Sequence, residues 1–502
     1  MSASQMLRCG RFAAAIAMGT MPFASGVSAA DSAGGFPDLQ VDPLRTRPPV
    51  LDAGVVLPGD GATWSCPAKL DLAMPVSLPD AVDAALCHDP QLRVTWAAIR
   101  VQAASVGQAR AAYLPALSAS VSGQRTGTRY STLPAADTSV KSYSSYAALN
   151  WRLFDFGERD ANRRAANDLL AAALASHDAA LQKTLGEVVQ AYFQALATQA
   201  GHRARTEAMQ LAEQTLAAAQ HREAHGATGR SDTLQSATAF ARAQLAERRA
   251  SGDADKAMAS LVHALGIPAG TRLRLPQDGH TPVKQRITDL AQWLDAAKSH
   301  HPAIIAAKQQ WEAARLKVMS ARSQGLPTVD FGVSFYQNGY PNQAVQATRS
   351  KTTIVGLTLT VPLFEGFAKT YRIREAQAVA EQNDAQIANT ERQVLGDIVR
   401  THADAASALA SLDSSAMLLE SAQAALESSR NRYAHGVADI LEVLNAQSAL
   451  ADAWQERIRT ESDWRSARLR LMANAGLLGR GTIVDIDSGS APSLSLAPSA
   501  VR

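Results

Sequence analysis

The sequence contains two copies of one unit, and this internal repeat constrains the fold more than any other feature. His-Asp-Pro at 88–90 matches His-His-Pro at 300–302, at an offset of 212. Further along the offset is 210, and residues 153–266 align with 363–476 without a gap. The two copies keep the same number of residues even where few of their residues are identical. This is expected if each copy is built from long helices whose register cannot slip.

The two copies, structural repeats 1 and 2, are predicted over 76–267 and 291–485. Each opens with a helix, predicted over 80–112 and 292–324. A Leu-Pro pair ends each of these helices, because the residue before a proline is driven out of helical geometry.

A β-hairpin is predicted next in each copy, at 116–154 and 328–364. In the first, Leu117, Ala119 and Val121 alternate with serines, and the same alternation runs through the second. A period of two residues is typical of strands with one apolar and one polar face.

Stretches 158–225 and 368–435 contain no proline, and each predicts one helix of about 100 Å at 1.5 Å per residue. Apolar steps of three and four residues indicate a coiled-coil seam. Gly226 and Gly436 follow these helices at the position of a C-terminal cap, so we expect the chain to turn there. Return helices are predicted over 230–264 and 440–474. The glycine turns would then lie at one end of an elongated bundle, with the hairpins at the other.

The remaining segments flank or join the copies. Residues 1–30 have the arginines, short apolar run and small residues of a secretory signal peptide, with an uncleaved anchor as the alternative. Residues 31–75 form a proline-rich N-terminal extension, 268–290 a linker, and 486–502 a disordered tail rich in Ser, Ala and Pro. No later stretch has 18 consecutive apolar residues, so a membrane-spanning part would have to consist of strands.

Three cysteines occur, and Cys9 would leave with the signal peptide. Cys66 and Cys87 remain. In an oxidising compartment they form either one disulfide or two buried free thiols.

Four strands per chain are too few to close a barrel in a membrane, where a sheet edge cannot stay unpaired. Two chains would supply eight strands, a barrel whose interior side chains fill, whereas three would supply twelve and leave a lumen. The predicted fold class is therefore mainly α with a small β part: a long α-helical coiled-coil barrel plus a transmembrane β-barrel shared between subunits. High alanine content with only 5% aromatic residues suits closely packed helices around a tunnel. The alternative is a soluble bundle with two ordinary hairpins.

The sequence resembles the TolC family of outer-membrane efflux and secretion channels over about 76–485. The motifs that carry the resemblance are Val-Pro-Leu-Phe-Glu-Gly at 361–366, Arg-Tyr-Ala-His-Gly at 432–436 and Leu-Glu-Val-Leu-Asn-Ala-Gln at 441–447. Trp-Ser-Cys-Pro at 64–67, with Ala-Leu-Cys at 85–87, is similar to the CyaE-like branch associated with type I protein secretion. The resemblance implies a homotrimer with a twelve-stranded barrel in the outer membrane of a Gram-negative bacterium, in contact with outer-membrane lipid. Its periplasmic tunnel would dock on an inner-membrane translocase and a periplasmic adaptor (membrane fusion) protein.

The resemblance also implies a gate at the periplasmic tip. Asp232 and Glu442, each six residues after a turn glycine, would ring the entrance, and Tyr433 would face Asp232. Two residues depart from the family pattern: Asn445 stands where a second acid would strengthen the ring, and Ala438 where a gate arginine can occur. The alternative reading of both acids is a first-turn carboxylate favoured by the helix dipole.

Other classes of function find little support. A formal charge of +3 over 502 residues gives no nucleic-acid signal. The motif His-Arg-Glu-Ala-His at 221–225 is neither of the known zinc-protease patterns, and no nucleotide loop or cysteine-rich metal box is present, so we expect no enzyme, no metal site and no cofactor. The function expected is a passive exit duct for type I secretion or efflux. A soluble periplasmic coiled-coil adaptor or tether without a pore is the alternative.

Overall fold

The computed structural model describes residues 42–53, 57, 66, 74–129, 131, 138–276, 287–338 and 350–487. The chain divides into two units, Met1–Pro43 and Leu44–Arg502, and the second contains all the elements described below. The predicted signal peptide lies outside the described residues, as do most of the predicted extension and tail and residues 277–286 of the predicted linker.

The first copy contains two short helices, a hairpin and two long helices. They are α2 (Leu78–His88), α3 (Pro90–Ala111), β1 (Ala116–Thr128), β2 (Thr138–Phe154), α4 (Glu158–Ala224) and α5 (Arg230–Ala264). A single turn of helix, α1 (Val50–Ala53), precedes them.

The second copy has the same element order. Its elements are α6 (Leu290–His300), α7 (Pro302–Ser323), β3 (Thr328–Asn338), β4 (Ser350–Thr360), α8 (Ala368–Ala434) and α9 (Ile440–Asn474). Helix α10 (Arg480–Asp487) follows, so the first residues of the predicted tail are helical. A mainly α chain with a small sheet and two internal repeats is confirmed.

The opening helix of each copy is broken in two, which corrects the prediction of one continuous helix. Asp89 (φ −60°, ψ 117°) and His301 (φ −66°, ψ 124°) are extended because each precedes a proline. Both residues also cap the next helix: the Asp89 carboxylate accepts from the Gln91 N–H at 2.8 Å, and His301 Nδ1 from the Ala303 N–H at 3.2 Å.

The four strands form one antiparallel sheet in the order β1-β2-β3-β4, with β2 and β3 joining the two copies. β1 and β4 are the outer strands, and each has one edge without a partner among the described residues. β4 ends at Thr360 rather than at the predicted 364, shortly before Pro362, which has no N–H to donate to a neighbouring strand.

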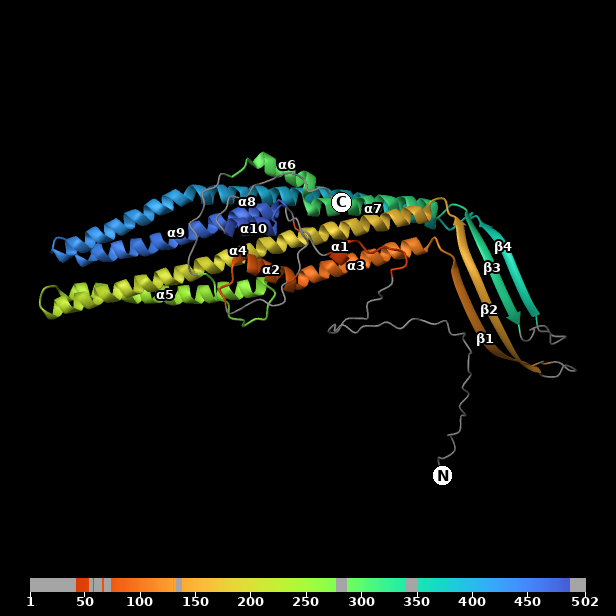
Figure 1. Cartoon of the computed structure of the whole chain (residues 1–502), viewed down its shortest axis with the longest axis horizontal. Helices are drawn as coiled ribbons and strands as arrows, with labels where there is room; N and C mark the ends of the chain where they lie inside the picture. Colours follow the sequence, from red (N-terminus) through yellow and green to blue (C-terminus); the bar gives the residue numbers. More distant parts are fainter. Residues whose placement is uncertain are drawn as a thin grey trace, which may run out of the picture. The chain divides into compact units, whose positions relative to one another are not determined.

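Helices α4 and α8, each of 67 residues, run the length of the unit (Figure 1). α5 packs along one part of α4 and α3 along another, and α9 and α7 flank α8 in the same way. The turns α4–α5 and α8–α9 therefore lie at the end of the unit opposite the sheet, as Figure 1 shows. The largest buried cluster lies between these ends and includes Leu185, Leu261 and Ile398, all fully buried.

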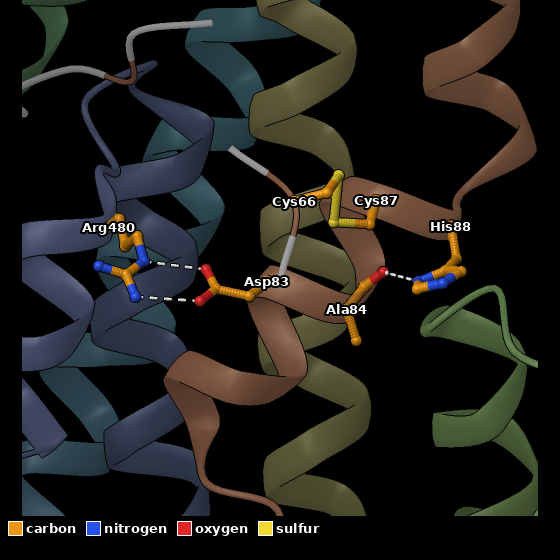
Figure 2. Close-up of a disulfide and its surroundings, with 6 residues drawn as sticks. All are labelled: Cys66, Asp83, Ala84, Cys87, His88 and Arg480. Atoms are coloured by element: carbon orange, nitrogen blue, oxygen red, sulfur yellow. Dashed lines mark hydrogen bonds and ion pairs between the residues drawn. A yellow bond between two sulfur atoms is a disulfide. The ribbon is translucent and has the colours of Figure 1, made fainter. Parts of the chain in front are cut away.

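Cross-links fasten Cys66, which precedes α2, and the residues around the start of α10 to the middle of the unit. Of the two alternatives for Cys66 and Cys87, the structure has the disulfide, with Cα atoms 5.6 Å apart (Figure 2). One helical turn before Cys87, Asp83 makes a two-point ion pair with Arg480 of α10, at 2.9 and 3.0 Å (Figure 2). The buried Gln182 amide bonds both backbone groups of Leu478. Segments far apart in sequence are thus held on α4 and α2.

Candidate functional site

The two turns at the far end of the helices are built alike. After α4, Gly226 (φ 73°) donates its N–H to the Glu223 carbonyl at 2.9 Å, and Ala227 donates to Arg222 at 2.9 Å. Gly436 (φ 74°) and the residue after it repeat this pattern after α8. This is the Schellman ending, which satisfies the last helical carbonyls and needs a left-handed residue. The predicted tip residues Gly226 and Gly436 occupy these positions.

Glu442 lies in the first turn of α9 and is bound within its own hairpin. Its carboxylate accepts from Arg432 Nη1 at 2.9 Å and from the Ser429 hydroxyl at 3.2 Å, both on α8. Its backbone N–H donates to Asp439, the N-cap of α9, at 2.9 Å. The negative charge of Glu442 is therefore partly compensated by Arg432.

Asp232 lies at the matching position of α5 and is half-buried. Its backbone N–H donates to the Gly229 carbonyl at 3.1 Å, and its carboxylate has no hydrogen bond or ion pair within the described part of the chain. Asn445, one turn beyond Glu442, is exposed. Asp232 thus keeps an uncompensated charge at the start of a helix, where the helix dipole favours it.

Within the chain Tyr433 contacts Arg222, and its pairing with Asp232 at the gate stays a prediction. The Arg222 guanidinium carbon lies 4.6 Å from the centre of the Tyr433 ring, and Arg222 Nη1 is 3.5 Å from the Tyr433 carbonyl oxygen. The Tyr433 hydroxyl is buried and has no partner among the described residues. The rest of the ring packs on the apolar cluster of Leu426, Ile440 and Val443.

The Arg222–Tyr433 contact lies nearest the turns in a row of side-chain contacts between the two helical hairpins. Further from the turns, the Gln447 amide donates to the Thr215 hydroxyl at 2.7 Å, and Arg205 pairs with Asp452 at 3.2 Å. All three run from α4 to the hairpin of α8 and α9. Separation of the two hairpins within one chain would have to break this row of contacts.

No helix among the described residues combines the length and apolar character needed to cross a membrane.

A comparison with known proteins identifies the family of this chain. The outer membrane efflux protein family matches residues 81–267 and 293–477, the two copies found in the sequence. Protein CyaE of Bordetella pertussis is 37% identical over 424 residues, which cover 84% of this chain and 88% of CyaE. The chain belongs to the outer membrane efflux protein family.

Two further proteins extend the comparison. Alkaline protease secretion protein AprF of Pseudomonas aeruginosa is 26% identical over 83% of this chain and 88% of its own. The crystal structure of the outer membrane protein VceC of Vibrio cholerae has the same fold, with a TM-score of 0.69 at 22% identity over 80% of this chain and 96% of VceC. The predicted resemblance to the TolC family and to its CyaE-like branch is confirmed, as is the location in the outer membrane of a Gram-negative bacterium.

Arg222 and Arg432 are the tip residues of this family member that sequence reasoning missed. A signal existed, because each precedes its turn glycine by four residues at the repeat offset of 210. A basic side chain in the last helical turn is also favoured by the helix dipole, so the pattern alone could not separate that role from a contact. The partners, Tyr433 for one and Glu442 for the other, became visible only in the fold.

Proposed function

We propose that the chain is one subunit of a passive exit duct in the outer membrane, which serves a type I protein secretion or efflux system and is gated at its helical tips. The observation that carries this proposal is the sheet. Among the described residues its outer strands each have an unpaired edge, and they carry exposed apolar side chains: Leu117 and Val121 on β1 are 77% and 83% exposed, and Leu357 and Leu359 on β4 are 68% and 65% exposed. An unpaired strand edge requires another strand to bond to it, and an exposed apolar face requires lipid or protein to cover it.

Three copies joined edge to edge would meet both requirements. β1 has 13 residues and β4 has 11, enough to cross the hydrocarbon layer, which needs about 9–11 tilted residues. Pairing of β1 with β4 of the next subunit would close a twelve-stranded barrel with a lumen and leave no edge in lipid. The proposed assembly is therefore a homotrimer, with the apolar side chains against outer-membrane lipid.

The helical end is the proposed entrance and gate. The row of contacts from Arg205 to Arg222 supports this, because it ties the two hairpins of one chain together up to the last turn before the glycines. Asp232 and Asn445 are proposed to line the opening, with Glu442 held back by Arg432. A passive duct takes its selectivity from aperture and wall charge, so no catalytic group is assigned.

The proposed partners are an inner-membrane translocase and a periplasmic adaptor protein, which would dock at the helical end. AprF is named a protease secretion protein, which favours protein export over drug efflux as the cargo class. The same exposed sheet weighs against a soluble coiled-coil adaptor, since such a protein would leave these apolar strands in water.

Cell fractionation combined with deletion of the gene tests the proposal. We expect the protein in the outer-membrane fraction, and we expect the deletion strain to lose a secreted protein while drug sensitivity stays unchanged. Increased drug sensitivity without a secretion defect would favour efflux. Recovery of the protein in the soluble periplasmic fraction would leave only the adaptor.

A further inference from the structure

Two histidines that the proposed duct does not use lie at the end of α4, His221 in its last turn and His225 at its C-cap. His221 and His225 are one helical turn apart, and both are exposed. Their rings stack, with centroids 4.3 Å apart and an angle of 30° between the planes. Two imidazoles therefore share one face of the helix, directly before the Gly226 turn.

The hydrogen bond of His225 fixes its tautomer. His225 Nδ1 lies 2.7 Å from the His221 carbonyl oxygen. Because a carbonyl only accepts, Nδ1 must carry the proton, and the lone pair of Nε2 is free. Neither ring nitrogen of His221 makes a hydrogen bond within the described part of the chain. Both rings thus have a nitrogen available as a ligand.

This arrangement matches the chemistry of a metal chelate. Histidines four residues apart on a helix can bind one ion together. A ligating histidine usually donates its other N–H to a carbonyl, which orients the ring, as His225 does here. The carbonyl end of a helix also carries partial negative charge, which favours a cation.

The intervening cation is turned away from the histidine pair. Arg222 lies between the two histidines in sequence, but its guanidinium is held over the Tyr433 ring of the other hairpin. The positive charge of Arg222 is therefore not directed at the two imidazoles.

We propose that His221 and His225 form a binding site for a divalent first-row transition metal, with Cu²⁺ bound most tightly and Ni²⁺ and Zn²⁺ more weakly. Imidazole suits these ions, and the order follows the general affinity series for divalent metals. No group of three or more His, Cys, Asp and Glu side chains gathers among the described residues, so water completes the coordination. The inference does not depend on the proposed transport function.

The second hairpin provides a matched control. His435 occupies the position of His225, and its Nδ1 lies 2.7 Å from the Asn431 carbonyl oxygen. The residue one turn earlier is Asn431 rather than a histidine. The two turns therefore have the same backbone and the same bonded imidazole, and they differ in the second ligand.

Titration of the purified full-length protein with CuCl₂, followed by calorimetry and electron paramagnetic resonance, tests the proposal. The protein must carry no histidine tag. We expect one Cu²⁺ per chain with a spectrum typical of two nitrogen ligands. Either His221→Ala or His225→Ala should weaken binding by at least about tenfold, because a single imidazole remains. His435→Ala should bind like the wild type.

A gain of function completes the test. Asn431→His should create a second Cu²⁺ equivalent per chain, since it reproduces the pair in the second hairpin. All of these side chains are exposed, so helical circular dichroism should be unchanged in every variant. The proposal is overturned if Cu²⁺ binding is absent, survives both His221→Ala and His225→Ala, or is lost equally in His435→Ala.

Discussion

At the scale of single residues, the tip shows what spacing can and cannot predict. Counting from the turn glycines placed Asp232, Tyr433 and Glu442 at the ends of the correct helices. It could not predict that Arg222 would lie over the ring of Tyr433, because that depends on how the hairpins pack. Arg222 and Arg432 occupy equivalent positions in the two copies yet bind a ring and a carboxylate respectively.

Two buried histidines predict how stability depends on pH. Burial lowers the pKa of His177 to about 4 and, as the largest of several causes, that of His301 to about 4. In the unfolded chain each should titrate near 6.5. As pH falls from 6.5 to about 4, the unfolded state gains protons that the folded state does not, so each histidine lowers the free energy of unfolding by up to about 3 kcal/mol.

Chemical unfolding at pH 7.5 and at pH 5.0, followed by circular dichroism, measures this effect. We expect the variant His177→Gln, His301→Asn to lose less stability on acidification than the wild type. His300→Gln, at an exposed neighbouring position, is the control and should follow the wild type. An unchanged loss in the double variant would show that other groups cause the acid sensitivity.

At the scale of elements, lengths were predicted well wherever proline was absent. The predicted helices 158–225 and 368–435 agree with α4 and α8 to within a residue. The opening helices were predicted wrongly as continuous, although Pro90 and Pro302 stand inside them. Each proline starts a new helix and forces an extended residue before it, so α2 and α6 are separate elements that pack on α4 and α8.

At the turn after α5, replacing Gly266 by alanine should strongly lower the free energy of unfolding. Gly266 has φ 65°, and a Cβ there would lie 2.8 Å from the His88 carbonyl carbon and oxygen. Gly226 has φ 73° with no atom within 4 Å of a Cβ. Gly226→Ala should therefore cost only the left-handed strain of about 1–2 kcal/mol. Gly266→Ala should cost at least about 1 kcal/mol more, because the backbone after α2 must move.

Midpoints of guanidinium unfolding compare the two glycine variants directly. Equal midpoints for Gly226→Ala and Gly266→Ala would contradict the close approach of the chain at His88.

The disulfide should stabilise the attachment of the N-terminal segment to α2. It joins residues 21 apart in sequence, and closing such a loop is worth about 3 kcal/mol. Cys87→Ser should lower the midpoint of thermal unfolding. Dithiothreitol should lower the midpoint of the wild type to the same value. A dithiothreitol effect of similar size on Cys87→Ser itself would exclude the disulfide as the cause.

At the scale of the whole molecule, the sequence predicted the two-copy plan and the placement of sheet and turns at opposite ends, because repeats and periodicity are properties of the chain itself. The association of chains is a different matter. Apolar side chains on α8, among them Met417 (65% exposed), and those on β1 and β4 are not covered by the described part of one subunit. We expect further copies and lipid to cover them, which no periodicity within one chain specifies.

Single-channel conductance in a planar lipid bilayer separates a duct gated at its helical tip from a chain that forms no pore. We expect stepwise insertion of conducting channels by the purified protein, and a higher conductance for Arg222→Ala, which removes the contact between the hairpins that lies nearest the turns. Arg459→Ala, which removes only an exposed ion pair within α9, should conduct like the wild type. Protein that inserts no channels, or an Arg222→Ala channel with wild-type conductance, would contradict the account.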